Sequence, residues 1–263
     1  MTQSPLIRIS ILIFSSLLST GVLASDVAKE KRWADQIVDV IMTGEPQWLV
    51  ADNHKFLSIY TEGANNKKSD GVIVIHGTGV HPNWTDVVQP LRTRLPDSGW
   101  HTLSLQMPIL SNEAGHEEYK PLFPEIAPRI NAGIAFLKSK GIKRIIIVGH
   151  SMGATMAGHY MATNPKTDVR ALVAIGATGL MFHDPKLDFI QSLKKIKKPI
   201  LEISGSDDLP EVLKTMELKA QTAKDSGNKH YRQTKIDGAN HFLVGKEDEL
   251  INIVNTYLQT QFK

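Results

Sequence analysis

The stretch IIIVGHSMGATMAGHY, residues 145–160, joins four β-branched residues to a run of small residues through a serine that stands between two glycines. The β-branched run is typical of a buried strand, and the small residues after Gly153 favour a helix. A sharp turn between such a strand and such a helix strains the central residue and exposes its side chain. The stretch therefore predicts a strand over 143–149, a turn that presents Ser151, and a helix over 152–163.

Alternation of strands and helices extends on both sides of this turn. Further strands are predicted at 71–77, 101–108, 170–177, 198–205 and 230–237, and further helices at 84–95, about 125–139 and about 247–261. A helix over 26–43 and two antiparallel strands within 47–63 precede them. Strands that are apolar almost throughout and are separated by helices indicate an α/β protein with a mostly parallel sheet and helices on both faces.

The segment between the strands at 170–177 and 198–205 is short. Only residues 178–198 separate the two strands, which is enough for a loop and one short helix. No large cap domain is therefore expected over the carboxyl edge of the sheet.

Composition limits the function classes. The 263 residues are 41% hydrophobic and carry 30 basic and 27 acidic side chains, for a formal net charge of +3. A chain of this length can bury the core of a single domain. A nucleic-acid binder would show a strong basic excess, so no nucleic-acid partner is expected.

The first residues have the pattern of an export signal. Arg8 precedes an apolar run over 9–24, and Val22 and Ala24 are small residues at the positions that a signal peptidase selects. Cleavage after Ala24 is expected, and an uncleaved membrane anchor is the alternative.

The rest of the chain is then expected to form one exported domain. Residues 1–24 are interpreted as a signal peptide and 25–263 as a single domain, periplasmic or secreted from a bacterium, with no stable membrane insertion after cleavage. The chain has no cysteine, which excludes disulfides, a thiol nucleophile and a lipid-bearing cysteine. The histidines show no metal-ligand spacing, and no P-loop or G-x-G-x-x-G is present, so neither metal nor cofactor is expected.

A serine hydroxyl is a poor nucleophile until a base accepts its proton. Ser151 lies where the carboxyl ends of parallel strands place ligand-binding residues. In a strand–turn–helix arrangement of this kind, an acid and then a histidine should follow in the chain. The segment IDGANHFLVG (236–245) places His241 between the last strand and the last helix. His241 is the candidate base.

Two aspartates compete for the role of the acid that orients the base. The segment LEISGSDDLPEV (201–212) places Asp207 and Asp208 directly after a strand. The acid often stands three residues after the glycine, here Gly205, and this spacing favours Asp208. Asp207 remains the alternative.

Acyl transfer also needs backbone N–H groups that stabilise a developing oxyanion. The strand at 71–77 ends in His76-Gly77, so the N–H of Thr78 is one candidate donor. The N–H of Met152, which follows the serine, is the second.

These motifs resemble those of the α/β-hydrolase fold superfamily. HGTG, GHSMG, GSDD and GANH stand in the expected order over residues from about 50 to 260. The stretch 75–108 is similar to a family of exported bacterial α/β-hydrolase-like proteins of unknown function. The resemblance implies an α/β-hydrolase fold with Ser151 as nucleophile, Asp208 as acid and His241 as base, and Thr78 and Met152 as oxyanion donors. The residues after the acid, LPEV, depart from the usual continuation, which leaves the choice between the aspartates open.

Several residues near these motifs are candidates for lining the substrate site. They come from the segments that follow the predicted strands: His81, Trp84, Met107, Leu180, Met181 and Phe182. Each of them also fits a plain packing role.

Two functions from different classes follow. The first is a serine hydrolase that cleaves a small carboxylic ester or thioester through an acyl-enzyme, with lactone cleavage or acyl transfer as variants of the same chemistry. The second is a non-catalytic exported interaction protein on an α/β-hydrolase scaffold. The complete set of Ser151, His241 and an aspartate favours the hydrolase.

Overall fold

The computed structural model describes residues 24–64, 69–179 and 184–262. The strands are β1 (Glu45–Ala51), β2 (His54–Thr61), β3 (Asp70–Ile75), β4 (His101–Leu105), β5 (Arg144–His150), β6 (Val169–Ile175), β7 (Ile200–Asp207) and β8 (Tyr231–Asn240). The α-helices are α1 (Val27–Val38), α2 (Val88–Arg94), α3 (Phe123–Ser139), α4 (Met152–Thr163), α5 (Phe189–Leu193), α6 (Pro210–Leu213), α7 (Met216–Asp225) and α8 (Glu247–Gln261). Two short 3₁₀ helices are η1 (Leu95–Ser98) and η2 (His116–Leu122).

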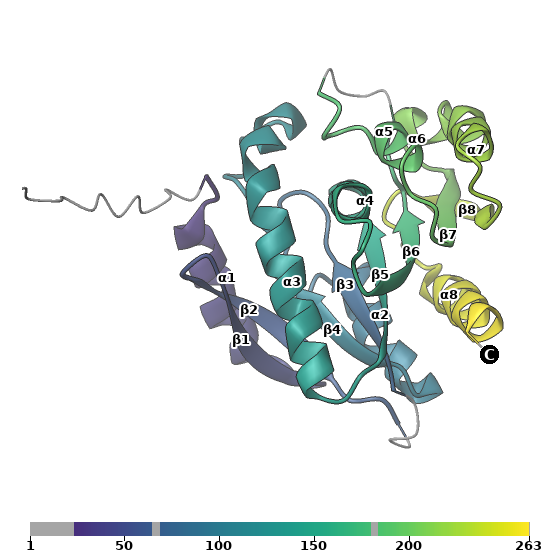
Figure 1. The fold of residues 1–263 in the computed structure, drawn as a ribbon. Coiled ribbons are helices and arrows are strands. Elements are labelled where there is room, and N and C mark those ends of the chain that lie inside the picture. Colours follow the sequence, from purple (N-terminus) through teal and green to yellow (C-terminus); the bar gives the residue numbers. More distant parts are fainter. Residues whose placement is uncertain (1–23, 65–68, 180–183, 263) are drawn as a thin grey trace, which may run out of the picture.

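Within these residues the strands form one sheet in the order β1-β2-β4-β3-β5-β6-β7-β8 (Figure 1). β1 pairs with β2, and β2 with β4, in antiparallel fashion, whereas all pairings from β4 to β8 are parallel. The prediction of a mostly parallel α/β sheet is confirmed. The chain order reverses beside β3, which lies between β4 and β5, and ligands bind outside the carboxyl ends of strands at such a reversal.

Alternate residues of the central strands face opposite layers of helices. Ile73 and Ile147 pack with the layer formed by α3, α4 and α5, whereas Val72 and Val148 pack with α2 and α8. Both layers are apolar because side chains along a strand point alternately to its two faces. The unbroken apolar runs that predicted buried strands are therefore explained by helices on both sides of the sheet (Figure 1).

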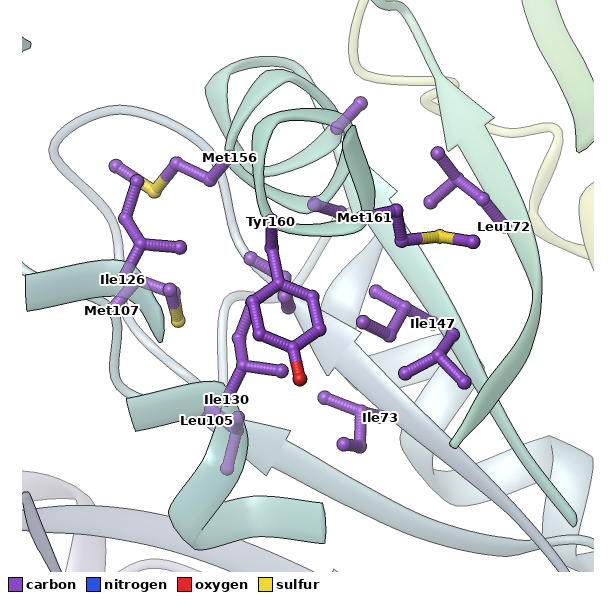
Figure 2. Close-up of a cluster of buried hydrophobic side chains, with 14 of the residues drawn as sticks. Ile73, Leu105, Met107, Ile126, Ile130, Ile147, Met156, Tyr160, Met161 and Leu172 are labelled. Atoms are coloured by element: carbon purple, nitrogen blue, oxygen red, sulfur yellow. The ribbon is translucent and has the colours of Figure 1, made fainter. Parts of the chain in front are cut away.

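Helix α4 is held against the sheet by one large cluster (Figure 2). The ring of Tyr160 points from α4 into the space bordered by Ile130 of α3 and Ile73 of the sheet. Its hydroxyl donates to Asn131 Oδ1 at 2.7 Å, so the one polar atom of the ring is satisfied. This packing fixes the N-terminus of α4, which directly follows Ser151.

Some boundaries differ from the predicted ones. The first helix ends at Val38 and not at residue 43, and Met42 is almost fully exposed. The sequence assigned no element to residues 209–229, where α6 and α7 lie.

The carboxyl edge of the sheet carries no separate domain. Among the described residues between β6 and β7, α5 is the only helix, so the prediction of no large cap domain is confirmed. Across the described ranges, no helix combines the length and the apolar character needed to cross a bilayer.

Candidate active site at the carboxyl edge of the sheet

Ser151 occupies the sharp turn between β5 and α4. Its backbone has φ 55° and ψ −123°, a conformation that non-glycine residues rarely adopt. Backbone bonds fix it there, since Ser151 N–H donates to the Ile175 carbonyl at 2.8 Å and Ala154 N–H donates to the Ser151 carbonyl at 2.9 Å. Strain that the surrounding structure maintains is typical of functional positions.

The two glycines of the motif are required by close packing around this turn. A Cβ atom on Gly153 would lie 2.4 Å from the His76 carbonyl oxygen, and one on Gly149 would lie 2.6 Å from the Gly153 carbonyl oxygen. Both distances are far inside van der Waals contact. The spacing of the motif therefore allows β3, the turn and α4 to approach one another.

His241 and Asp208 meet in the loops after β8 and β7. His241 Nδ1 lies 2.6 Å from Asp208 Oδ1, and both side chains are almost completely buried. Asp208 also accepts from Leu209 N–H at 2.7 Å and from Gly205 N–H at 3.2 Å. Burial opposes ionisation, but the bond and the charge interaction with His241 and these backbone donors outweigh it, so the pKa of Asp208 is lowered. An ionised Asp208 makes Nδ1 the protonated nitrogen of His241 and leaves Nε2 as an acceptor.

The structure distinguishes the two aspartates that the sequence left open. Asp207 is exposed and accepts a bond from Ser206 Oγ at 3.3 Å. Asp208 is the one that contacts His241.

The candidate nucleophile, base and both oxyanion donors selected from the sequence line one cavity. This cavity of about 490 Å³ is bordered by Thr78, Ser151, Met152 and His241. Asp208 is not part of its lining and contacts His241. A larger, polar hollow of about 730 Å³ lies at the amino ends of the parallel strands and is lined by none of these residues.

The turn that carries Thr78 is held from both sides. His76 Nε2 accepts from Met107 N–H at 2.9 Å, so its Nδ1 carries the proton and donates to the Gly77 carbonyl at 2.8 Å. Burial lowers the pKa of His76 to about 3 and keeps the ring neutral. On the other side, Gly79 N–H donates to the Tyr119 hydroxyl at 3.1 Å.

The remaining walls of the cavity are mostly aromatic or come from the loop after β4. Trp84, Tyr119 and Phe242 contribute rings. The other side chains and backbone segments that line it are Gly77, Gly79, Val80, Ser111, Asn112, Ala114, His116, His150, Thr178 and Leu209.

Only some of the residues predicted to line the substrate site border the cavity. Trp84 lines the cavity, with its Nε1–H donating to Asp86 Oδ2 at 3.1 Å. Met107 does not, because it is fully buried in the hydrophobic core. His81 does not either, because its ring packs edge-on against Trp33 and Trp84. Leu180, Met181 and Phe182 lie outside the described residues.

Two residues that position His241 were missed by the sequence analysis. His150 Nε2–H donates to the His241 carbonyl oxygen at 3.0 Å, and the two ring centroids are 5.0 Å apart. Gly176, at the end of β6, has φ +59°, and a Cβ there would lie 2.9 Å from His241 Cε1. The positive φ of Gly176 could have been suspected from its place at a strand end, but its contact with His241 joins segments that are distant in the chain.

Adding one methyl group beside His241 tests this packing. If the site is catalytic with His241 as a reacting group, Gly176→Ala is expected to lower kcat on the order of 10²-fold, because displacing such a group by about 1 Å has an effect of that size. Gly227→Ala is the matched control, since Gly227 also has positive φ but a Cβ there would meet nothing within 4 Å. Both variants should lose about 1–2 kcal/mol of stability from the left-handed backbone. Steady-state kinetics and urea unfolding would check this, and equal kcat values for the two variants would contradict the proposed contact.

The buried histidines predict a loss of stability on acidification. Burial lowers the pKa of His150 to about 4 and that of His76 to about 3, from an ordinary 6.5. Between pH 6.5 and about 4 the unfolded chain binds protons that the folded chain does not, so the free energy of unfolding falls as the pH is lowered through this window. Urea unfolding at several pH values would give the free energy of unfolding as a function of pH. This free energy should fall less steeply on acidification for His150→Gln, whose amide can still donate to the His241 carbonyl. The same dependence on pH in the variant and the wild type would contradict the claim that burial lowers the pKa of His150.

In the part of the chain that the structure describes, no three His, Asp or Glu side chains gather in a way that could hold a metal ion.

A family described as "protein of unknown function (DUF3530)" matches residues 27–125 and 117–260. No curated protein matches the sequence.

Similar folds are found among solved structures. Est1E from Butyrivibrio proteoclasticus, solved with ferulic acid bound, is 18% identical, with a TM-score of 0.65 over 82% of this chain and 98% of that one. An esterase of Pyrococcus furiosus is 19% identical, with a TM-score of 0.64 over 82% of this chain and 92% of that one. A Xanthomonas campestris protein described as an α/β serine hydrolase without lid is 13% identical, with a TM-score of 0.63 over 84% and 96%. These similarities establish the α/β-hydrolase fold.

Proposed function

Because the chain belongs to the DUF3530 family of proteins of unknown function and has the α/β-hydrolase fold, we propose that it is a serine hydrolase that cleaves a small carboxylic ester or thioester. Ser151 is the nucleophile, His241 the general base and Asp208 the acid that orients it. The observation that carries the proposal is that His241 is bound at Nδ1 by buried Asp208 and shares a cavity with Ser151.

The acylation step follows from this arrangement. His241 Nε2 accepts the proton of Ser151 Oγ as the oxygen attacks the substrate carbonyl carbon. The carbonyl oxygen becomes an oxyanion, which the N–H groups of Thr78 and Met152 stabilise. The carbon–oxygen bond to the alcohol then breaks, and His241 gives its proton to the leaving alcohol. The acyl group remains on Ser151.

Deacylation repeats these steps with water. His241 Nε2 accepts a proton from a water molecule, whose oxygen attacks the acyl carbon. Collapse of the second oxyanion releases the carboxylic acid and returns the proton to Ser151. The contact with ionised Asp208 stabilises the positive charge of His241 in both halves of the reaction.

The cavity favours a small substrate with a flat or short acyl group. Its volume of about 490 Å³ is at the low end of the range for ligand sites. Trp84, Tyr119 and Phe242 offer aromatic faces. The binding of ferulic acid, an aromatic acid, by a protein of similar fold supports an aromatic acyl group as one candidate.

The turn at Gly77 provides a further prediction. A Cβ on Gly77 would lie 3.1 Å from Ser151 Cβ and 3.3 Å from the His150 carbonyl, which would force the oxyanion turn away from the nucleophile. Gly77→Ala is expected to lower kcat by about 10²–10³-fold, the effect of losing one oxyanion donor. Its free energy of unfolding should change much less. Full activity in this variant would refute the assignment of Thr78 as a donor.

Hydrolysis of a panel of model esters tests the function. The wild-type protein and Ser151→Ala should each be assayed with p-nitrophenyl esters of increasing acyl length, with methyl ferulate and with one acyl thioester. We expect Ser151-dependent release of product that declines as the acyl chain outgrows the cavity. The same rates in the variant as in wild type, or no hydrolysis of any of these compounds, would contradict the proposal.

We also propose that the protein acts after export. The charged and apolar pattern of residues 1–24 supports removal of that segment by a signal peptidase.

A further inference from the structure

A buried cluster of charges joins the start of the described chain to α3. Ser25 Oγ–H donates to Glu125 Oε2 at 2.8 Å, and Ser25 N–H donates to Glu125 Oε1 at 3.1 Å. Arg129 Nη2 contacts the same carboxylate at 3.2 Å and, with Nη1, binds both oxygens of Glu30 at 2.9 Å. Ala24 N–H also donates to Glu125 Oε1, at 2.8 Å.

The cluster has more negative than positive charge. It contains two carboxylates, Glu30 and Glu125, but one guanidinium, Arg129, and these side chains are between 2% and 10% exposed. His54 lies 2.9 Å from Glu30 and adds a positive charge only when it is protonated. An uncompensated buried carboxylate is costly, so a second cation beside Glu125 would stabilise the fold.

Cleavage at the expected site would create that cation. Signal peptidase breaks the Ala24–Ser25 amide bond with one water molecule, which leaves a carboxylate on Ala24 and an amino group on Ser25 that takes up a proton. Ala24 is exposed and Ser25 is buried, so the new terminus would lie at the entrance of the cluster. One N–H donor 3.1 Å from Glu125 would become an ammonium group with three.

We propose that Glu125 and its neighbours form a binding site for the α-ammonium group of Ser25, which the chain can fill only after processing. The site is independent of the proposed hydrolase activity, but it depends on cleavage after Ala24. With the ammonium in place the charges of Ser25, Glu30, Glu125 and Arg129 sum to zero.

This site also connects the N-terminus to a wall of the cavity. Directly after Ser25, Asp26 N–H donates to the Ile109 carbonyl at 2.7 Å. One turn into α1, Lys29 Nζ donates to the Leu110 carbonyl at 2.9 Å and to Asn112 Oδ1 at 2.6 Å. Asn112 lines the cavity. Binding of the processed terminus would therefore fix α1 and, through it, the loop after β4.

Reactivity of the terminal amine tests the proposal. The full chain is exported from a bacterial host, the processed protein is isolated, and its first residue is identified by mass spectrometry. An amine-reactive acylating reagent is then applied near pH 8 to native and urea-unfolded protein, and labelling of the Ser25 amine is followed over time. Near pH 8 an ordinary α-amino group is about half neutral, so a rise of one unit in its pKa lowers the reactive neutral fraction about fivefold, and labelling should be slowed by this factor or more in the native protein.

Two variants separate this site from general protection by folding. Glu125→Gln should label at a rate close to that of the unfolded chain, whereas Glu217→Gln, which changes an exposed glutamate on α7, should behave like wild type. The comparison of native with unfolded wild type remains decisive if Glu125→Gln does not fold. A terminus other than Ser25, or equally fast labelling of the native and unfolded wild-type protein, would overturn the proposal.

Discussion

Replacing Ser151 by alanine is expected to lower kcat for ester hydrolysis by about 10⁶-fold, the loss that follows removal of the nucleophile in serine hydrolases. The backbone bonds that hold the turn involve the N–H and the carbonyl of residue 151 and do not use Oγ. Because alanine keeps these bonds, the free energy of unfolding should remain within about 1 kcal/mol of the wild-type value.

A serine at the same edge of the sheet provides the control. Ser206 precedes Asp207, and its Oγ accepts a bond from Gly238 N–H at 2.8 Å without lining the cavity. Ser206→Ala should keep kcat near the wild-type value. A folded Ser151→Ala variant that keeps more than a trace of the wild-type rate would show that Ser151 is not the nucleophile.

Substitutions of the two neighbouring aspartates are expected to have very different effects on kcat. Asp208→Asn is expected to lower kcat by about 10⁴-fold, because the amide carries no charge to stabilise protonated His241 and can favour the wrong tautomer of the ring. Asp207→Asn should have little effect, since Asp207 is exposed and has no contact with His241 among the described interactions. Steady-state kinetics on the two variants would also show which aspartate, Asp207 or Asp208, acts as the acid. Equal losses in both variants would contradict the geometry.

Asp208 should also contribute to the loss of stability at acid pH. The pKa of Asp208 is lower in the folded chain than in the unfolded one, so its stabilising contribution is present above its ordinary pKa of 3.8 and disappears as the pH falls through the folded value. Asp208→Asn removes this part of the acid sensitivity.

The sequence predicted those parts of the fold that are encoded over short distances. The helix over 152–163 was predicted with its observed bounds because Ser151 and the glycines on either side fix where β5 ends and α4 begins. Strands such as β5 and β6 were recognised because both of their faces are apolar. The shared location of Ser151 and His241 followed from a general property of parallel sheets, whose strands end at the same edge.

Other features depend on contacts that no short pattern contains. Helix α7 was not predicted, because the residues that it buries are Lys219 and Ala223 and not an apolar stripe. Lys219 is fully buried because its Nζ donates to the Ala177 carbonyl at 2.7 Å and forms an ion pair with Glu202. A lysine stabilised in this way gives no apolar periodicity.

The lining of the cavity was predicted least well for a similar reason. Met107 lies near the end of the strand predicted at 101–108, so it resembles a residue at the mouth of the site, yet its side chain points into the core. His81 follows the oxyanion turn, but Trp33 of α1 packs against it. Which side of a loop faces the cavity depends on packing with α1 and α3, and these helices are distant in the chain.

Covalent labelling of the proposed nucleophile tests the central claim most directly. A fluorophosphonate probe would be applied to the purified protein, the modified residue located by mass spectrometry, and Ser151→Ala treated in parallel. A single adduct on Ser151 is expected in the wild-type protein and none in the variant. A folded wild-type protein that is not labelled, or one that is labelled on another residue, would contradict the claim that His241 and Asp208 activate Ser151.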